Sequence, residues 1–528
     1  MEKLYNMNCF QGNMNLFKNK KAGEISFFIL SAFVILMIAS RSSFLYPCND
    51  WNDANSYFSV GKALFNGKMP YRDVFDQKGM YLYFLYGLAY LVSHTTFWGV
   101  FILEVILATV DLFGIFRILQ LYVRRETALC LAPVALAAAF CSKSFYWGGS
   151  AEEICYPFLI WGLYLSLNYF KNDYPERKMN RGKLFVGGIL AGIVANIKFT
   201  VLGFFFAWMM CVAFAFLVKK DFFGAVKACL VFLMGMAIPF VPWLIYFGIQ
   251  KGLYEWYFGY VYVNVFAYSN LNAEGPGLYE RIYTLTKLLY WLIRDNLIYF
   301  IFVIAGVLWG TFGFQKKFLE RINLLSLCFF LFLGIYVGGS SLPYYALPLS
   351  VFTVLGMALF GEFLEWAADR LIRRSDRLFG TVPARAGIVV GMVFSLTVCV
   401  GMIWSLSMNI PYMKEKREDM FLYKFKEIVE ETENPTLLNI GCLDAGLYTV
   451  CDIVPTCRWF QTQTIHIDDV LRDQEQYIRE GRTDYIIARD EYPEVILDKY
   501  ELVAQAPWYQ GDLEFTYYLF RLKKAERK

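Results

Sequence analysis

Residues 46–86 read YPCNDWNDANSYFSVGKALFNGKMPYRDVFDQKGMYLYFLY and follow directly on an apolar segment at about residues 25–40. Among the charged residues of this stretch are Asp50, Asp53, Asp73, Asp76, Lys62 and Lys78. Charged side chains are costly beside lipid and are seldom kept there without a function. We therefore expect a charged loop at the membrane surface, whose carboxylates could act on a lipid-linked substrate.

The composition of the whole chain is that of a membrane protein. Of its 528 residues, 57% are hydrophobic and 19% aromatic, and the mean hydropathy is +0.40. These values exclude a soluble globular protein and predict several α-helical membrane spans. The net charge of +4 is small for this length, and no basic run is interleaved with aromatic residues. The sequence therefore does not predict nucleic-acid binding.

Histidine and cysteine usage restricts the chemistry further. Only two histidines occur, His94 and His466, so neither a Ser-His-Asp arrangement nor a His-ligated zinc site is expected. Carboxylates, lysines and tyrosines must then carry any catalysis. The twelve cysteines are scattered, and a disulfide between Cys451 and Cys457 is conceivable outside the membrane.

The distribution of positive charge predicts the topology. Lysines precede the first span, which puts residues 1–24 in the cytoplasm and the following loop outside. Residues 79–94 are apolar but shorter than the roughly 20 residues that a crossing helix needs. If they crossed, the five Lys and Arg residues of 171–183 would face outward, against the positive-inside rule. We therefore expect 55–66 and 79–94 to be interfacial helices.

This arrangement predicts about eleven membrane-spanning helices. Residues 1–409 would form the transmembrane domain, with the outer loop at 41–96. From about residue 410 the sequence becomes polar, and helix-like segments alternate with short apolar strands such as TLLNIG and TDYIIA. Residues 410–528 are therefore predicted to form a small extracytoplasmic α/β domain, on the same side as the acidic loop.

The acidic loop also resembles a known family. Its pattern is Asp53, Gly61, Gly67, then Pro70-Tyr71-Arg72-Asp73 and Phe75-Asp76-Gln77-Lys78-Gly79. It is similar to the first outer loop of bacterial GT-C membrane glycosyltransferases of the family 39 group, relatives of protein O-mannosyltransferases and lipid A aminoarabinose transferases. The resemblance implies that Asp53 is the catalytic base and that Lys78 lies near the lipid phosphate. The sequence departs from the family at Met80, where proline is usual.

Each of these assignments has a structural alternative. Asp53 could instead be a helix N-cap, since Asp favours that position. Asp50 is a second catalytic candidate, or a solvated loop charge. Lys78 could stabilise the departing phosphate or only snorkel to the interface. Arg72 is a further candidate for substrate binding, although an ion pair within the loop is the simpler interpretation.

Candidates outside the loop lie where further segments reach the same surface. Glu152 and Glu153 follow Gly148-Gly149, where the family often has an acidic pair that binds a divalent metal or the acceptor, although a helix-end charge is an equal alternative. Tyr344 and Tyr345 occupy the place of a His-Tyr pair and could line a sugar or prenyl pocket or belong to an interfacial belt. Lys198, at a turn between two spans, could face the phosphate or snorkel.

Together these features predict a multi-pass plasma-membrane glycosyltransferase. It would move a sugar from a polyprenyl-phosphate donor to an extracytoplasmic acceptor (a cell-envelope glycan, lipid or protein) with inversion. No cofactor is certain, and a divalent metal could be held by Asp53, Glu152 and Glu153. The alternatives are a transporter or flippase of lipid-linked saccharides, which would show inverted repeats, and a scaffold that binds lipid headgroups.

Overall fold

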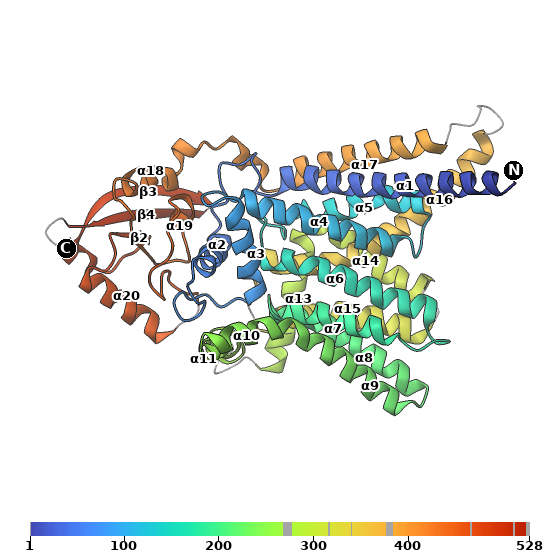
Figure 1. Cartoon of the computed structure of the whole chain (residues 1–528), viewed down its shortest axis with the longest axis horizontal. Coiled ribbons are helices and arrows are strands. Elements are labelled where there is room, and N and C mark those ends of the chain that lie inside the picture. The colour runs from blue at the N-terminus through green and yellow to red at the C-terminus, as the bar shows by residue number, and fades with distance from the viewer. Residues whose placement is uncertain are drawn as a thin grey trace.

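The protein has two parts, a long helical bundle and a small α/β domain at one end of it (Figure 1). The computed structural model describes residues 2–267, 277–314, 317–338, 341–375, 384–464, 467–510 and 513–523. The N-terminus lies at the end of the bundle that is far from the α/β domain.

The bundle consists of long apolar helices. Within the described ranges, seven helical segments are long and apolar enough to cross a membrane, or eight if α13 and α14, which meet at a bend of 113°, count as one span. The chain therefore has the predicted multi-span architecture, and the number of eleven spans stays a prediction. The bundle helices are α1 (Glu2–Ala39), α4 (Trp98–Leu119), α5 (Arg125–Phe140), α6 (Ala151–Asn168), α7 (Arg181–Ala195), α8 (Gly203–Val218), α9 (Phe222–Ala237), α10 (Val241–Ile249), α13 (Leu278–Asp295), α14 (Leu297–Leu308), α15 (Phe318–Tyr336), α16 (Thr353–Ser375) and α17 (Ala384–Leu406).

Two short helices, α2 (Asn52–Phe65) and α3 (Met80–Val92), lie between the bundle and the α/β domain (Figure 1). They pack against each other. The 13 residues of α3 extend only about 20 Å at 1.5 Å per residue, whereas a bilayer core is about 30 Å thick. Both helices were predicted, at 55–66 and 79–94, and their interfacial position stays a prediction.

Short irregular helices join the longer ones. Those that reach the end of the bundle near α2 are important for the site described below: η2 (Phe199–Leu202), α11 (Leu253–Trp256), η4 (Tyr257–Ala267) and η6 (Pro343–Phe352). The others are η1 (Tyr169–Asp173), η3 (Ile238–Phe240), η5 (Trp309–Phe314), η7 (Ile410–Lys414) and η8 (Arg417–Asp419).

The α/β domain contains one sheet of four strands in the order β1-β2-β4-β3. Its first two strands are parallel, with Leu437 opposite Tyr485, and the connection between them includes α20. The remaining pairs are antiparallel. This confirms the predicted alternation of strands and helices. The elements are α18 (Phe421–Val429), β1 (Leu437–Ile440), α19 (Leu447–Val450), α20 (Asp468–Glu480), β2 (Tyr485–Arg489), α21 (Ile496–Lys499), β3 (Tyr500–Gln510) and β4 (Leu513–Leu522). Cys451 and Cys457 are both free thiols, without the conceivable disulfide.

The α/β domain packs against one face of helix α2 and forms hydrogen bonds with it. Ser56 and Ser59 donate hydrogen bonds of 2.6 Å to Gln461 and Asp444. The buried ammonium of Lys62 donates to the carbonyl of Tyr448 at 3.0 Å. The domain and the acidic loop therefore lie at the same end of the molecule. The domain boundary at residues 409 and 410 remains a prediction.

Candidate active site

Asp53 lies in the first turn of α2 and does not cap it. The N-cap position is Trp51, and no side chain forms a cap hydrogen bond there, so the alternative interpretation of Asp53 as an N-cap is wrong. The Tyr344 hydroxyl instead donates a hydrogen bond of 2.5 Å to Oδ2 of the Asp53 carboxylate. Within the described residues no other side chain donates to this carboxylate, which leaves Oδ1 available to a substrate.

Tyr344 and Tyr345 in η6 connect Asp53 with Lys198. Tyr344 is held in an aromatic cluster, with its ring centroid 4.8 Å from that of Trp51 and 5.7 Å from that of Tyr146. The ammonium of Lys198 lies 3.7 Å from the ring centroid of Tyr345, a cation–π distance. Both predicted tyrosines therefore belong to the same cluster as Asp53 and Lys198.

Lys78 is fixed by backbone contacts on both sides. Tyr71 donates its hydroxyl to the Lys78 carbonyl at 2.6 Å. The next residue, Gly79, donates its N–H to the Ile197 carbonyl at 3.3 Å, and a Cβ at Gly79 would lie only 1.9 Å from the Asn196 carbonyl oxygen. Since Asn196 and Ile197 directly precede Lys198, this close approach brings the two lysines together. It also fixes the turn where the family has proline, because α3 begins at Met80.

The two lysines line one cavity of about 200 Å³, together with Tyr345, Tyr260 and Asn264. In the part of the chain that the structure describes, no atom accepts a hydrogen bond from the Lys78 ammonium. Burial opposes its charge, but the carboxylates of Asp76 and Asp53 outweigh burial and raise the pKa of Lys78. A charged ammonium that has no hydrogen-bond acceptor among the described residues thus lines a cavity that could hold an anion.

Glu152 forms an ion pair with Lys198 at the start of α6. Its other oxygen, Oε2, is buried and has no hydrogen-bond partner among the described residues. The same is true of the buried hydroxyl of Tyr57. Burial, with the nearby carboxylates of Asp53, Asp76 and Glu152, raises the pKa of Tyr57 well above its usual value. The cluster therefore contains buried polar atoms that the protein itself leaves unsatisfied, which is costly unless a ligand pairs with them.

Glu153 makes a different contact from its neighbour. Its carboxylate accepts the N–H of Gly149 at 2.7 Å, while its own N–H donates to Ser150 at 3.0 Å. Gly148 and Gly149 have φ of +84° and +78°, values that favour glycine. This turn directs Glu152 toward Lys198 and ties Glu153 to the backbone. Of the predicted acidic pair, only Glu152 joins the cluster.

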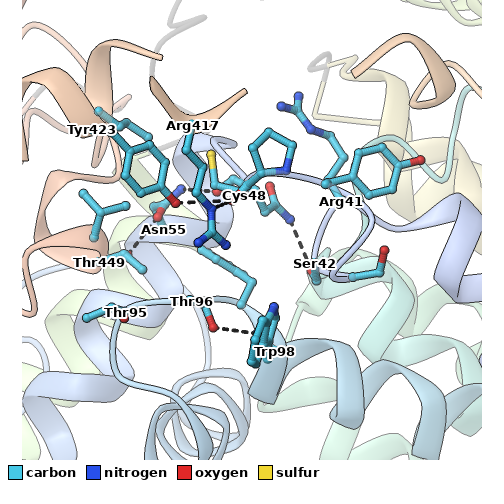
Figure 2. Close-up of a pocket in the computed structure, with 17 residues that line it drawn as sticks. Arg41, Ser42, Cys48, Asn55, Thr95, Thr96, Trp98, Arg417, Tyr423 and Thr449 are labelled. Carbon is cyan, nitrogen blue, oxygen red and sulfur yellow. Dashed lines mark hydrogen bonds between the residues drawn. The ribbon is translucent and has the colours of Figure 1, made fainter. Parts of the chain in front are cut away.

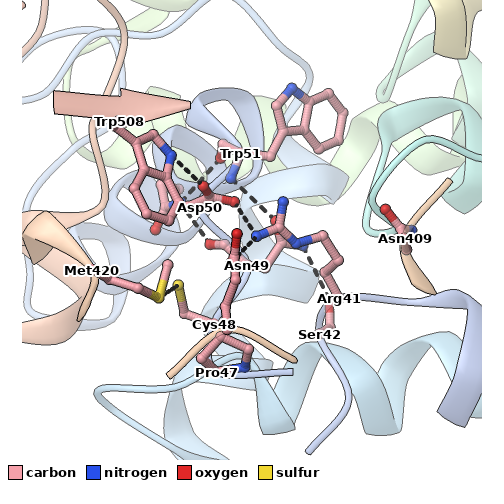
Figure 3. A network of polar contacts seen from close by, with 12 residues as sticks. Arg41, Ser42, Pro47, Cys48, Asn49, Asp50, Trp51, Asn409, Met420 and Trp508 are labelled. Atoms are coloured by element: carbon pink, nitrogen blue, oxygen red, sulfur yellow. Dashed lines mark hydrogen bonds and ion pairs between the residues drawn. The ribbon is translucent and has the colours of Figure 1, made fainter. Parts of the chain in front are cut away.

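Asp50 is not brought together with the other candidates. Its side chain is buried and forms an ion pair of 2.7 Å with the buried Arg41 at the end of α1 (Figure 3). Its second oxygen accepts the indole N–H of Trp508 from β3 at 2.8 Å. The guanidinium of Arg41 also lies over the rings of Tyr412 and Trp147, at 4.2 and 4.9 Å from their centroids. Asp50 therefore joins the bundle to the α/β domain.

A second recess lies beside this ion pair (Figure 2). Arg41, Arg417 and Tyr423 are among the residues that line it. Its volume of about 20 Å³ suits a water molecule and no larger ligand. None of the predicted site residues lines it.

Arg72 also lies apart from the cluster. Its exposed guanidinium bonds Asp73 at 2.9 Å and the Gln250 carbonyl at 3.4 Å. Arg72 therefore forms an ion pair within the loop, which was the alternative to a role in substrate binding.

The residues proposed for a divalent metal do not form a ligand set. Asp53 is bonded to Tyr344, Glu152 to Lys198 and Glu153 to Gly149. Throughout the described ranges, no three His, Cys, Asp or Glu side chains are grouped to hold a metal ion.

Several residues of the cluster were not assigned from the sequence. Asp76 was named only as one of the loop charges, but it accepts a hydrogen bond of 2.8 Å from Tyr83 and raises the pKa of Lys78. Nothing in the sequence marked Tyr57 as a site residue except its position one helical turn after Asp53. Tyr260 and Asn264 lie in η4, and no motif in the sequence marked them as site residues.

The helical bundle, the short α2–α3 pair and the terminal α/β domain together have the GT-C fold that the sequence predicted. The comparison rests on solved structures. The chain is similar to ArnT from Cupriavidus metallidurans crystallised with undecaprenyl phosphate, with a TM-score of 0.60 and 12% identity over 94% of this chain and 98% of that one. The apo crystal structure of the same ArnT has a TM-score of 0.60 and 11% identity, over 96% of this chain and 99% of that one.

A third structure, the archaeal oligosaccharyltransferase AglB from Archaeoglobus fulgidus, gives a TM-score of 0.45 and 12% identity over 89% of this chain and 69% of that one. No family model matches the sequence, and no curated protein matches it. The likeness to ArnT therefore concerns the fold.

Proposed function

We propose that the protein is a glycosyltransferase that moves a sugar from a polyprenyl-phosphate carrier to a hydroxyl group of an acceptor, with inversion at the anomeric carbon. The observation that carries this proposal is the unpaired, largely buried ammonium of Lys78 in a cavity close to Asp53. An ammonium that has no hydrogen-bond acceptor among the described residues can bind an anionic ligand, and a phosphate that departs from a sugar is such an anion.

Asp53 is the base in this reaction. The acceptor oxygen attacks the anomeric carbon and its proton passes to the free oxygen of Asp53, while the bond from that carbon to the phosphate oxygen breaks. The Tyr344 hydroxyl holds the carboxylate in place through Oδ2. A positioned base of this kind contributes a factor of about 10²–10⁴ to the rate.

Lys78 binds the phosphate and stabilises the charge that it gains as it leaves. Lys198 lines the same cavity but is already paired with Glu152, so we assign it a supporting role. The unpaired oxygen of Glu152 and the hydroxyl of Tyr57 are then the groups that pair with sugar hydroxyls. A polyprenyl-phosphate donor agrees with the fold, since one of the ArnT structures that share it contains undecaprenyl phosphate.

The membrane side is also part of the proposal. The basic loop at 171–183 lies at the end of the bundle that is far from the acidic loop, because α6 and α7 connect the two ends. By the positive-inside rule that end faces the cytoplasm, and Asp53 and the α/β domain face outward. The acceptor would then be a glycan, lipid or protein of the cell envelope.

The test compares envelope glycans by mass spectrometry in cells that make the wild type, Asp53→Asn or Lys78→Met. Loss of one sugar modification in both variants, at unchanged protein level, is expected. The exposed residues Asp498 and Lys424 provide the matched controls, Asp498→Asn and Lys424→Met, which should behave as wild type. A transporter or flippase would keep its modification in Asp53→Asn, and that result would refute the proposal.

A further inference from the structure

A second cavity lies at the opposite end of the bundle, among α7, α8 and α9. It has a volume of about 250 Å³ and begins where the loop after α6 enters α7. Three cationic side chains line it, Lys178, Arg181 and Lys227, with one carboxylate, Asp221. None of the residues assigned to the transfer reaction takes part in it.

The positive charge of this cavity is only partly neutralised. Lys178 pairs with Asp221 at 2.5 Å, whereas Arg181 and Lys227 have no partner among the residues that the structure describes. Three cations and one carboxylate leave a net charge of +2. Both unpaired side chains are exposed at the cavity, so an anionic ligand can reach them without a change in the fold.

The ends of two helices add to this charge. Helices α7 and α9 both begin here, capped by Asn180 and Asp221, and the N-terminal end of a helix carries a partial positive charge. The caps already accept the N–H groups of Gly182, Lys183 and Gly224. The helix ends therefore contribute a positive electrostatic potential, while the side chains of Arg181 and Lys227 remain available for hydrogen bonds to a ligand.

The wall between the charges is apolar, formed by Met179, Leu184, Phe216 and Ala228. Next to it Phe222 and Phe223, at the start of α9, are 63% and 85% exposed. These two exposed rings place an apolar surface beside the cavity, where burial against lipid acyl chains would be favourable. A ligand at this place can keep its charged group on Arg181 and Lys227 while its apolar part remains in the bilayer.

We propose that this cavity binds the phosphate headgroup of an anionic glycerophospholipid. Basic pockets between membrane helices are suited to such headgroups. A lysine that only snorkels to the interface would need no cavity. Here the side chains of Arg181 on α7 and Lys227 on α9 line the same cavity. The inference is independent of the proposed transfer reaction, because it concerns the other end of the bundle.

The experiment uses the purified full chain in detergent and measures bound lipid by native mass spectrometry. Phosphatidylglycerol is expected to bind at least tenfold more tightly than phosphatidylcholine with the same acyl chains. Arg181→Gln/Lys227→Gln should remove this preference, and Arg181→Lys/Lys227→Arg should keep it. The matched control is Lys219→Gln/Lys220→Gln, which removes two charges near the same turn but outside the cavity lining, and should bind as wild type.

Three results would overturn the proposal. Equal binding of the two lipids by the wild type would show that the headgroup charge is not recognised. Equal loss in the control variant would show a general effect of surface charge. Inorganic phosphate at millimolar concentration that displaces the lipid completely would point to a site for a free anion. The melting temperature of each variant, measured without lipid, is expected to match that of the wild type.

Discussion

The indole N–H of Trp508 donates to Asp50 at 2.8 Å and so joins strand β3 of the α/β domain to a residue three positions before Asp53. On the other side of the acidic loop, the N–H of Phe75 donates to the Arg458 carbonyl at 2.9 Å, and Gln463 donates to the Phe75 carbonyl at 3.1 Å. The domain therefore contacts the chain close to both Asp53 and Lys78. We infer that it positions the candidate site.

The first prediction concerns Trp508. Trp508→Phe keeps an aromatic ring but removes the N–H donor, and a hydrogen bond to a charged group contributes about 1.5–3 kcal/mol. We expect a lower melting temperature and a transfer rate lower by about tenfold, the latter as an order-of-magnitude expectation for a displaced base. The control is Tyr509→Phe on the same strand, whose hydroxyl donates to the exposed Glu514 at 2.9 Å. Equal rates in both variants would contradict the positioning role.

The second prediction concerns the buried ion pair. Arg41→Met leaves the carboxylate of Asp50 buried without its cation, and the loss of one partner of a buried pair costs about 3–5 kcal/mol. We expect a large drop in melting temperature and in the yield of folded protein. Arg41→Met/Asp50→Asn should recover much of the loss, because the uncompensated charge is gone. If the double variant were less stable than Arg41→Met, Asp50 would not be held by charge pairing.

These contacts also explain which parts of the site could be predicted from sequence. Local charge and hydropathy predicted that Asp53 and Lys78 lie in one loop, that short helices surround it and that an α/β domain follows the bundle. The sequence could not predict that Asp50 and Asp53 have different roles. This difference depends on the contacts of Asp50 with Arg41 and with Trp508, which is 458 residues away from it in the chain. Contacts over such distances leave no trace in the spacing of a single sequence.

The acidic pair illustrates the same limit at short range. Glu152 and Glu153 are neighbours in the first turn of α6, and sequence alone could not tell which one faces the site. Their directions depend on the turn at Gly148 and Gly149, where both glycines have positive φ. The two glycines signalled a turn but not its geometry.

The third prediction separates these two glutamates. Glu152→Gln removes the charge that holds Lys198 and changes the unpaired oxygen that we assign to the sugar, so transfer should fall by about 10²-fold, within the range of a lost transition-state contact. Glu153→Gln keeps an oxygen that can accept the Gly149 N–H and leaves the Glu152–Lys198 pair in place, so no contact assigned to the transition state is lost and transfer should remain within about threefold of wild type. Both rates are measured on purified protein as release of polyprenyl phosphate. A larger loss in Glu153→Gln would reverse the assignment.

The fourth prediction uses the buried carboxyl of Asp444, where the α/β domain meets α2. Burial raises its pKa from 3.8 to about 6, against hydrogen bonds from Ser59 and Gly446 and the charge of Lys62. Between pH 3.8 and 6 the folded protein therefore holds a proton that the unfolded chain has lost. The free energy of unfolding must then fall as the pH rises through this window, by roughly 3 kcal/mol for a shift of this size, and is constant above it as far as this group is concerned.

Asp444→Asn tests this behaviour, because asparagine does not titrate and keeps an oxygen for the Gly446 N–H, which donates to Asp444 at 2.8 Å. Melting temperatures of the wild type and the variant, measured in detergent from pH 4 to 7.5, give a difference from which other titrating groups cancel. The wild type should lose stability relative to the variant up to about pH 6, and the difference should then stay constant. Parallel curves for the wild type and Asp444→Asn would mean that the folded carboxyl is already ionised at pH 4, and that Ser59 and Gly446 compensate its burial.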